Sequence, residues 1–290
     1  MTNNSYFIFF TIYYGYNRRP KERLIMIRKY ILTVSLFFCF VSTHLFAVEI
    51  KALPPTLTLP KALYNHCLEL TQSQQLLKEY ILIGLQNRYK NPEKTLPVSI
   101  EKYDTRLKTL QHFLDTQFHE EKSRKQFAEG VALWEKIKLL LSSPPSKENA
   151  KQIQTMLAAM YKKLKATKVL ANKKFESVKI TGRICYSSQK MATLYLLKKA
   201  WQLTIPDYQT LMKKSMADFE KRMKKLASLK INTPEITKAL KEANLAYSYF
   251  VHMYDAKSTV IPTLIVRKSD TIFEKIKTVK RLYGALLRNK

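Results

Sequence analysis

The chain has 290 residues, a formal net charge of +29, five glycines, eleven prolines and three cysteines. So few glycines exclude a glycine-rich phosphate-binding loop, and the cysteines lack the spacing of a zinc site. Long apolar-periodic segments, interrupted only by prolines at a few places, favour an all-α protein.

The N-terminal part of the chain is typical of a secreted protein. We interpret residues 1–25, which are crowded with aromatic side chains, as an upstream extension before a true start at Met26. Residues 26–47 have the parts of a cleaved signal peptide: Arg28 and Lys29, an apolar run over 31–41, and a polar stretch that ends in Ala47. The alternative is an uncleaved anchor, because the run over 31–48 is at the short limit for a membrane span. We therefore expect a periplasmic or secreted protein. Removing 1–47 takes away six basic residues and one acidic residue and leaves a net charge of +24.

Residues 48–60 form a proline-rich lead-in, and helical periodicity then runs almost to the end of the chain. Apolar residues recur in steps of three and four over about 61–88, 100–114 and 127–141. Between 145 and 206 the only helix breaker is Gly182, and a seven-residue seam from Leu157 to Ala192 predicts one long helix over about 148–202.

Three further helices are expected after that long helix. One follows Pro206, and a second starts at Thr233-Pro234, where a capping residue precedes proline. Thr271 and Glu274 have the spacing of a capping box and predict the start of the last helix.

A weak internal repeat organises these helices. TQSQQLLKEYILIGLQ (71–86) is echoed 115 residues later by YSSQKMATLYLLKKAW (186–201), and Gln74 and Gln189 occupy the same step of an otherwise mainly apolar stripe. A buried amide costs roughly 1–3 kcal/mol unless it is hydrogen-bonded, so two such exceptions at one step predict a shared polar layer inside the bundle.

The repeat continues beyond this motif. With offsets of 116 and 113, Tyr103 aligns with Phe219 and Trp134 with Tyr247. The sequence thus predicts an elongated all-α helical bundle of two tandem repeats with about three helices each, 61–145 and 146–290, the second of which also includes a C-terminal helix.

The second repeat resembles a known family. ITGRICYSSQKMATLYLLKKAW (180–201) is similar to the signature of the N-terminal domain of type IV pilus methyl-accepting chemotaxis transducers, the PilJ-like family. Similarity continues collinearly through 206–226, 231–250 and 260–283, and the first repeat matches more loosely, so the resemblance covers about 61–285. It implies an extracytoplasmic helical sensing module.

The resemblance also suggests candidate ligand-binding residues. The positions that match the signature and that we select are Gly182, Arg183, Ser188 and Gln189 in the second repeat, and Ser73 and Gln74 in the first. The family contacts an anion through a second arginine, but Cys185 and Leu70 stand at that step. Because this arginine is missing, the resemblance does not imply that this chain binds the family's anion, nitrate.

Several residues have two interpretations. The serine and glutamine pairs either receive a small anion or polar ligand, or the glutamines bond to each other or to a backbone carbonyl and fix helix register. Cys67 and Cys185 either form a disulfide in an exported protein or are two small buried thiols. The histidines beyond the signal show no metal spacing, and we expect them to be exposed or half-buried: His66, His112, His119 and His252.

No arrangement of nucleophile, base or paired carboxylates stands out, so we expect neither catalysis nor a cofactor or metal. The function we predict is an exported sensor-type module that binds a small ligand or a partner protein and associates with another helical bundle, such as a second copy of itself. The alternative is a basic structural protein of the cell envelope, whose lysine pairs, such as Lys162-Lys163 and Lys224-Lys225, attach to an anionic surface. Without a base-reading motif, no specific nucleic-acid partner is expected.

Overall fold

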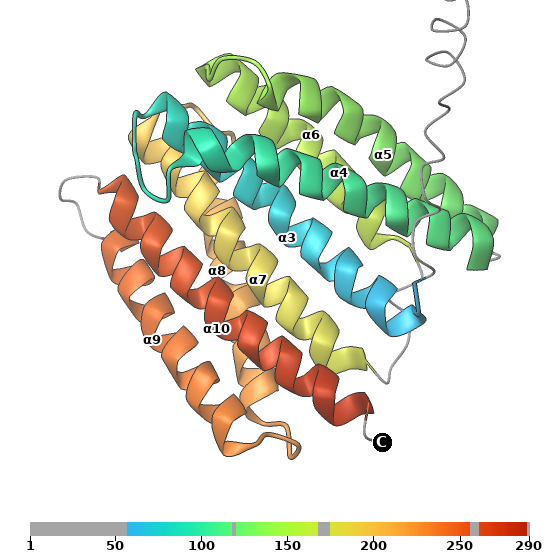
Figure 1. The fold of residues 1–290 in the computed structure, drawn as a ribbon. Coiled ribbons are helices and arrows are strands. Elements are labelled where there is room, and N and C mark those ends of the chain that lie inside the picture. The colour runs from blue at the N-terminus through green and yellow to red at the C-terminus, as the bar shows by residue number, and fades with distance from the viewer. Residues whose placement is uncertain (1–56, 118–119, 168–174, 256–260, 289–290) are drawn as a thin grey trace, which may run out of the picture. The chain divides into compact units, whose positions relative to one another are not determined.

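The computed structural model describes residues 57–288 apart from 118–119, 168–174 and 256–260. The upstream extension, the signal peptide and most of the lead-in lie outside these residues. The described residues form helices and no strand, which confirms the all-α prediction. In chain order the helices are α3 (Leu59–Gly84), α4 (Pro92–Gln117), α5 (Glu121–Leu141), α6 (Lys147–Lys165), α7 (Glu176–Tyr195) with a π-helical turn η3 (Leu196–Ala200), α8 (Tyr208–Ala227), α9 (Pro234–Asp255) and α10 (Pro262–Arg288) (Figure 1). Each of them is too short or too polar to be a membrane span.

Helices α3 to α6 form the first half. α3 packs against α4 and α6, and α5 packs against both α6 and α4. Their common core contains the fully buried rings of Tyr80, Tyr103, Phe127 and Trp134. α6 starts sharply because the Ser146 hydroxyl accepts a hydrogen bond from the backbone N–H of Asn149 at 3.1 Å.

Helices α7 to α10 form the second half with the same relations. α7 packs against α8 and α10, and α9 packs against α10. The start predicted at Thr233-Pro234 is confirmed: α9 begins at Pro234, and the Thr233 hydroxyl accepts from the Ile236 N–H at 3.3 Å.

Matching aromatic pairs support the repeat. The Tyr103 and Trp134 ring centroids lie 4.3 Å apart, between α4 and α5. At the aligned positions, the Phe219 and Tyr247 centroids lie 4.2 Å apart, between α8 and α9. In each half, one buried aromatic contact thus joins the two outer helices, α4 with α5 and α8 with α9.

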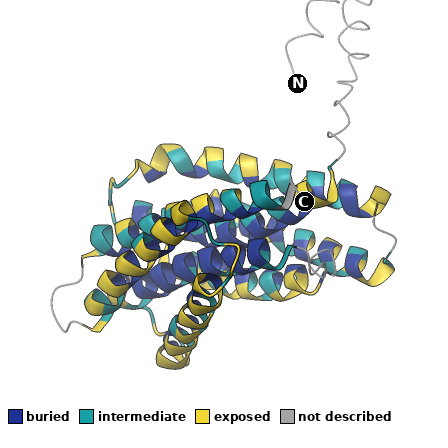
Figure 2. Cartoon of the chain, turned by 90° about the horizontal axis from the view of Figure 1, so that it is seen from below, coloured by how far each residue is buried: buried dark blue, intermediate teal, exposed yellow. Residues whose placement is uncertain are grey.

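The first helices of the two halves, α3 and α7, lie against each other in the middle of the bundle. Most residues of α3 and α7 are buried, and Figure 2 shows the buried residues gathered in the middle of the bundle, with exposed faces on the outside. A helix that is covered on several sides has no solvent face on which polar residues can be placed freely. Every polar side chain of α3 and α7 that is buried here therefore needs a partner inside the protein.

The single helix predicted over 148–202 is wrong. α6 ends at Lys165 and α7 begins at Glu176. At the end of α6, the backbone N–H and the hydroxyl of Thr167 both donate to the Leu164 carbonyl, at 3.3 and 2.7 Å. The seven-residue seam misled because it serves two cores: Leu164 is buried in the first half and Val178 in the second.

Two related boundaries also differ from the predictions. α6 belongs to the core of the first half, so each half has four helices among the described residues, and the division falls between 165 and 176 rather than at 145. The last helix begins at Pro262, not at Thr271, whose hydroxyl instead donates to the Arg267 carbonyl one turn back, at 2.9 Å. This places Asp270 in the interior of α10.

Candidate functional site

α3 and α7 run in the same direction and pair at equivalent positions of the repeat (Figure 1). They are in tight contact at Gly182, where an added Cβ would lie 2.7 Å from the Cβ of Cys67. Cys67 and Gly182 are themselves 115 residues apart, the offset of the repeat. The glycine is therefore required by helix contact, and it is not exposed to a ligand.

Both glutamines of the repeat are buried, Gln74 with 1 % and Gln189 with 0 % of its surface exposed. The Thr193 hydroxyl donates to the backbone carbonyl of Gln74 at 3.3 Å, and Lys78 Nζ donates to the side-chain Oε1 of Gln189 at 2.5 Å. Thr193 is the repeat equivalent of Lys78, so the two contacts lie at equivalent positions of the repeat, although only Gln189 takes part through its side chain. The Gln74 Oε1 atom is buried without a hydrogen-bond partner among the described residues. The predicted polar layer exists, and it lies between the two halves.

An ion pair extends this layer to α10. Lys78 forms a salt bridge with Asp270 Oδ1, and Lys90 Nζ lies 2.7 Å from the Oδ2 atom of the same carboxylate. Burial opposes the charge of Asp270, but Lys78 and Lys90 outweigh this effect and hold its pKa below the usual range. The Gln189 amide also donates to the Ser269 carbonyl at 3.1 Å, so its side chain is satisfied at both ends.

Beside the ion pair, a cavity of about 120 Å³ lies between α3, the start of α4 and α10. Lys78, Glu79, Tyr89, Lys90 and Asp270 are among the residues that line it. The Lys90 side chain is 58 % exposed, so the cavity connects the buried layer with solvent. At about 30 Å³ per water molecule, the space admits roughly four waters or one small polar molecule.

One wall of this cavity has an unsatisfied acceptor. Glu79 Oε2 is buried without a hydrogen-bond partner in the part of the chain that the structure describes. Burial raises the pKa of Glu79, although Lys78 and the hydroxyls of Ser99 and Thr95 partly offset the effect. The cavity therefore offers donors from the lysines and a carboxyl group that lacks one donor.

The other predicted residues contribute less. The hydroxyls of Ser73 and Ser188 donate to carbonyls of their own helices, those of Leu70 and Cys185, at 2.9 and 2.8 Å. Gly182 and Arg183 precede Gln189 by about two helical turns, so they lie roughly 10 Å further along α7. The structure therefore buries Gln74 and Gln189 in the contact between α3 and α7, but none of the six predicted residues is among those that line the cavity.

Sequence reasoning missed Lys78, Glu79, Lys90 and Asp270. A signal was available for Lys78, which follows Gln74 by one helical turn and so shares its side of α3. Asp270 was missed because the last helix was predicted to start at Thr271, which left Asp270 outside it. His66 is a further correction: it is buried rather than exposed, and burial lowers its pKa to about 4, because the charged ring would lose its hydration.

Both cysteines of the described chain are free and buried. Burial raises the pKa of each thiol, for Cys185 to about 12, because a thiolate is costly in an apolar environment. We expect the native protein to resist alkylation of Cys67 and Cys185 by iodoacetamide near pH 8, and the denatured protein to react at both. Peptide mass mapping checks this; a peptide pair linked through the two residues would instead reveal the disulfide.

No family model, curated protein or solved structure matches the chain. The similarity to the PilJ-like signature thus stays a prediction from residues 180–201 and the segments that follow. Among the described residues, no three histidine, cysteine or acidic side chains gather as metal ligands. The polar layer and its cavity, where a charged pair is buried inside the bundle, are therefore the candidate functional site.

Proposed function

We propose that the protein is an exported, non-enzymatic sensor-type module that binds a small polar molecule in the cavity beside Lys78 and Asp270. The observation that carries the proposal is the buried polar layer between α3, α7 and α10, which reaches solvent through Lys90. Charged groups are seldom placed inside a helical bundle, because apolar residues of the same size fill the space at lower free-energy cost.

The lining residues suggest the chemical class of the ligand. Lysine ammonium groups donate, whereas Asp270 and Glu79 accept, and the unsatisfied Glu79 oxygen calls for a donor. A small molecule with both an amino and a carboxylate or amide group, such as an amino acid, fits this set. The PilJ-like resemblance favours the same class of function, since it implies a sensing module outside the membrane.

The pairing of α3 with α7 supports a further part of this proposal. Two equivalent helices meet side by side around one polar layer, as two subunits of a symmetric dimer do. In this chain both copies are joined covalently, so the module completes its site without a second subunit. Association with a partner protein then transmits to that partner whether the ligand is bound.

Thermal unfolding of the full chain against amino acids, nitrate, phosphate and small carboxylates tests the proposal. A ligand at about one hundred times its Kd adds about 2.7 kcal/mol, and a shift in Tm on the order of 5 to 10 °C follows for a domain of this size. We expect one compound class to give a saturable shift that survives raised salt. Lys90→Ala should abolish the shift, and Lys94→Ala, which changes an exposed lysine nearby, should not.

A second variant separates binding from structure. Gln189→Leu removes the acceptor of Lys78 and should keep the helix content, as measured by circular dichroism. If the glutamine only fixes the register of α3 against α7, stability falls, because the buried Lys78 loses an acceptor, and the thermal shift remains; a ligand role predicts loss of the thermal shift, with Gln152→Leu on the surface as the control. The absence of any salt-resistant shift, or a shift unchanged in Lys90→Ala, favours the basic envelope protein instead.

A further inference from the structure

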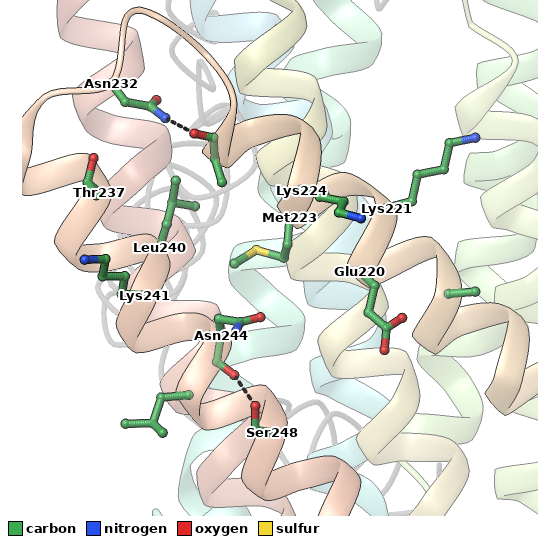
Figure 3. A pocket seen from close by; sticks show the side chains of 13 residues that line it. Glu220, Lys221, Met223, Lys224, Asn232, Thr237, Leu240, Lys241, Asn244 and Ser248 are labelled. Atoms are coloured by element: carbon green, nitrogen blue, oxygen red, sulfur yellow. Dashed lines mark hydrogen bonds between the residues drawn. The ribbon is translucent and has the colours of Figure 1, made fainter.

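A groove of about 990 Å³ separates α8 from α9 near the loop that joins them (Figure 3). Met223 reaches from α8 into the space between the helices, and Leu240 faces it from α9 (Figure 3). Both side chains are buried and form the floor, whereas Leu245 on the rim is 59 % exposed. The groove thus has an apolar floor that extends to an exposed leucine.

The first half of the chain fills the corresponding position. With the repeat offset of 113, Phe127 is the equivalent of Leu240, and its larger ring is fully buried in the core. With the offset of 116, Asp104 is the equivalent of Glu220. Asp104 accepts from Trp134 Nε1 at 3.0 Å and forms ion pairs with Lys108 and Lys138, so it ties α4 to α5.

The second half lacks these ties. Glu220 Oε1 accepts from the Tyr247 hydroxyl at 2.8 Å, but Glu220 forms no ion pair with any residue that the structure describes. The smaller side chain of Leu240, and one hydrogen bond in place of a charged cluster, leave space between α8 and α9 beyond their aromatic contact. The groove is therefore open in the second half and filled in the first, although both halves have the same fold. The repeat alone does not explain why it is there.

The charged part of the groove lining is mainly basic, with three lysines and one acidic residue, Glu220. Lys221 and Lys224 come from α8 and Lys241 from α9, and all three are exposed. Within the described ranges, none of them pairs with a carboxylate. Unpaired cations beside an apolar floor are complementary to a partner with acidic side chains next to apolar ones.

The dimensions of the groove suggest a helix. Its lining runs from Ala217 to Ala227 on α8 and from Thr237 to Ser248 on α9, which corresponds to about 15 Å or three turns of each helix at 1.5 Å per residue. An amphipathic helix places side chains i, i+3, i+4 and i+7 into such a groove. Methionine on the floor adapts to different apolar side chains.

We propose that this groove, defined by Met223, Leu240, Leu245 and the lysines at 221, 224 and 241, docks an acidic amphipathic helix of a partner protein. A second copy of the chain is a poor occupant, because each copy has 51 basic and 22 acidic residues. Two copies would bring lysines close to lysines, and like charges repel each other. The groove lies in the outer helix pair of the second half, apart from the cavity at Lys78.

Fluorescence anisotropy of a labelled synthetic peptide with the full chain tests the proposal. The probe is a peptide of about fourteen residues, long enough to fill the groove as a helix, with leucines at i, i+3, i+4 and i+7 and glutamates beside them. A scrambled peptide of the same composition is its control. We expect saturable binding of the first peptide and at least tenfold weaker binding of the second, about 1.4 kcal/mol in affinity.

Surface variants locate the binding without disturbing the fold. Lys221→Glu with Lys241→Glu should weaken binding roughly tenfold, because two attractive contacts become repulsive. Lys151→Glu with Lys162→Glu, which reverses two exposed lysines of α6, should change it less than about twofold. Leu245→Glu should also weaken binding, and Leu139→Glu on α5 should not, although Leu139 is exposed as well.

Three outcomes would overturn the proposal. The first is that the scrambled peptide binds as tightly as the amphipathic one, and the second is that the α6 control variant loses as much peptide affinity as the groove variant. The third is that phosphatidylglycerol vesicles bind through the same lysines while the peptide does not bind, which would assign the groove to a membrane surface. Lys90→Ala should bind the peptide normally, so a failure here is separate from a failure of the cavity proposal.

Discussion

Replacing Asp270 by leucine is expected to lower the free energy of unfolding by roughly 3–5 kcal/mol, because it leaves the buried ammonium group of Lys78 without its carboxylate. The Lys78 side chain is 5 % exposed, and Gln189 would be its only remaining described partner. Urea denaturation followed by circular dichroism measures the change. Asp218→Leu, which breaks a partly exposed pair with Arg222, should cost less than about 1 kcal/mol.

The double variant makes this expectation specific. Lys78→Met together with Asp270→Leu removes both charges and should recover most of the lost stability, since apolar residues of similar volume replace a buried pair at little or no cost. If the double variant is as unstable as the sum of the single variants, the two charges do not compensate each other inside the bundle.

The pair should also make the protein acid-sensitive. The pKa of Asp270 is lower in the folded chain than the value of about 3.9 in an unfolded one. Its stabilisation is therefore complete above about pH 4 and is lost as the pH falls through the folded pKa. Compared with the wild type, the double variant should lose less stability over that acidic range.

Replacing Gly182 by alanine should destabilise the protein by roughly 1–3 kcal/mol, although alanine is the better helix former. The added methyl group would lie 2.7 Å from the Cys67 Cβ and 2.9 Å from its Sγ. The Cβ of Cys67 is attached to the α3 backbone, so α3 and α7 must separate, and overpacking of this kind costs roughly 1–3 kcal/mol. The gain in helix propensity, up to about 1 kcal/mol, does not offset it.

Gly284→Ala provides the matched control. It also lies within a helix, α10, and no atom lies within 4 Å of its added Cβ. Only the propensity term applies, so this variant should be more stable than the wild type, by up to about 1 kcal/mol. Equal effects of the two substitutions in chemical denaturation would mean that α3 and α7 do not touch at Gly182.

The all-α fold and the burial of Gln74 and Gln189 could be predicted because they depend on local periodicity and on the repeat. The contact of Lys78 with Asp270 could not, since the two residues are 192 positions apart, and a charge within a stripe is usually taken for a solvent-facing residue. The break after Lys165 was missed for a similar reason. A seven-residue seam specifies which side of a helix is buried, but it does not say which core buries it.

The groove at α8 and α9 was equally hidden from sequence reasoning. Leu240 and Phe127 are both apolar and both occupy buried steps, so the pattern is identical in the two halves. Only the volume of the side chains and the ties made by Asp104 distinguish them. Such differences in packing become visible when the two copies are compared in three dimensions.

The parallel pairing of α3 and α7 at equivalent positions can be tested by disulfide trapping. In a background with Cys39→Ser and Cys185→Ser, the thiol introduced by Gly182→Cys should form a disulfide with Cys67 under mild oxidation, since their Cβ atoms are close enough once the helices relax slightly. Lys190→Cys, about two turns further along α7, should remain reduced. Peptide mapping that finds the link at 190 and none at 182 would contradict the pairing on which the polar layer and its cavity depend.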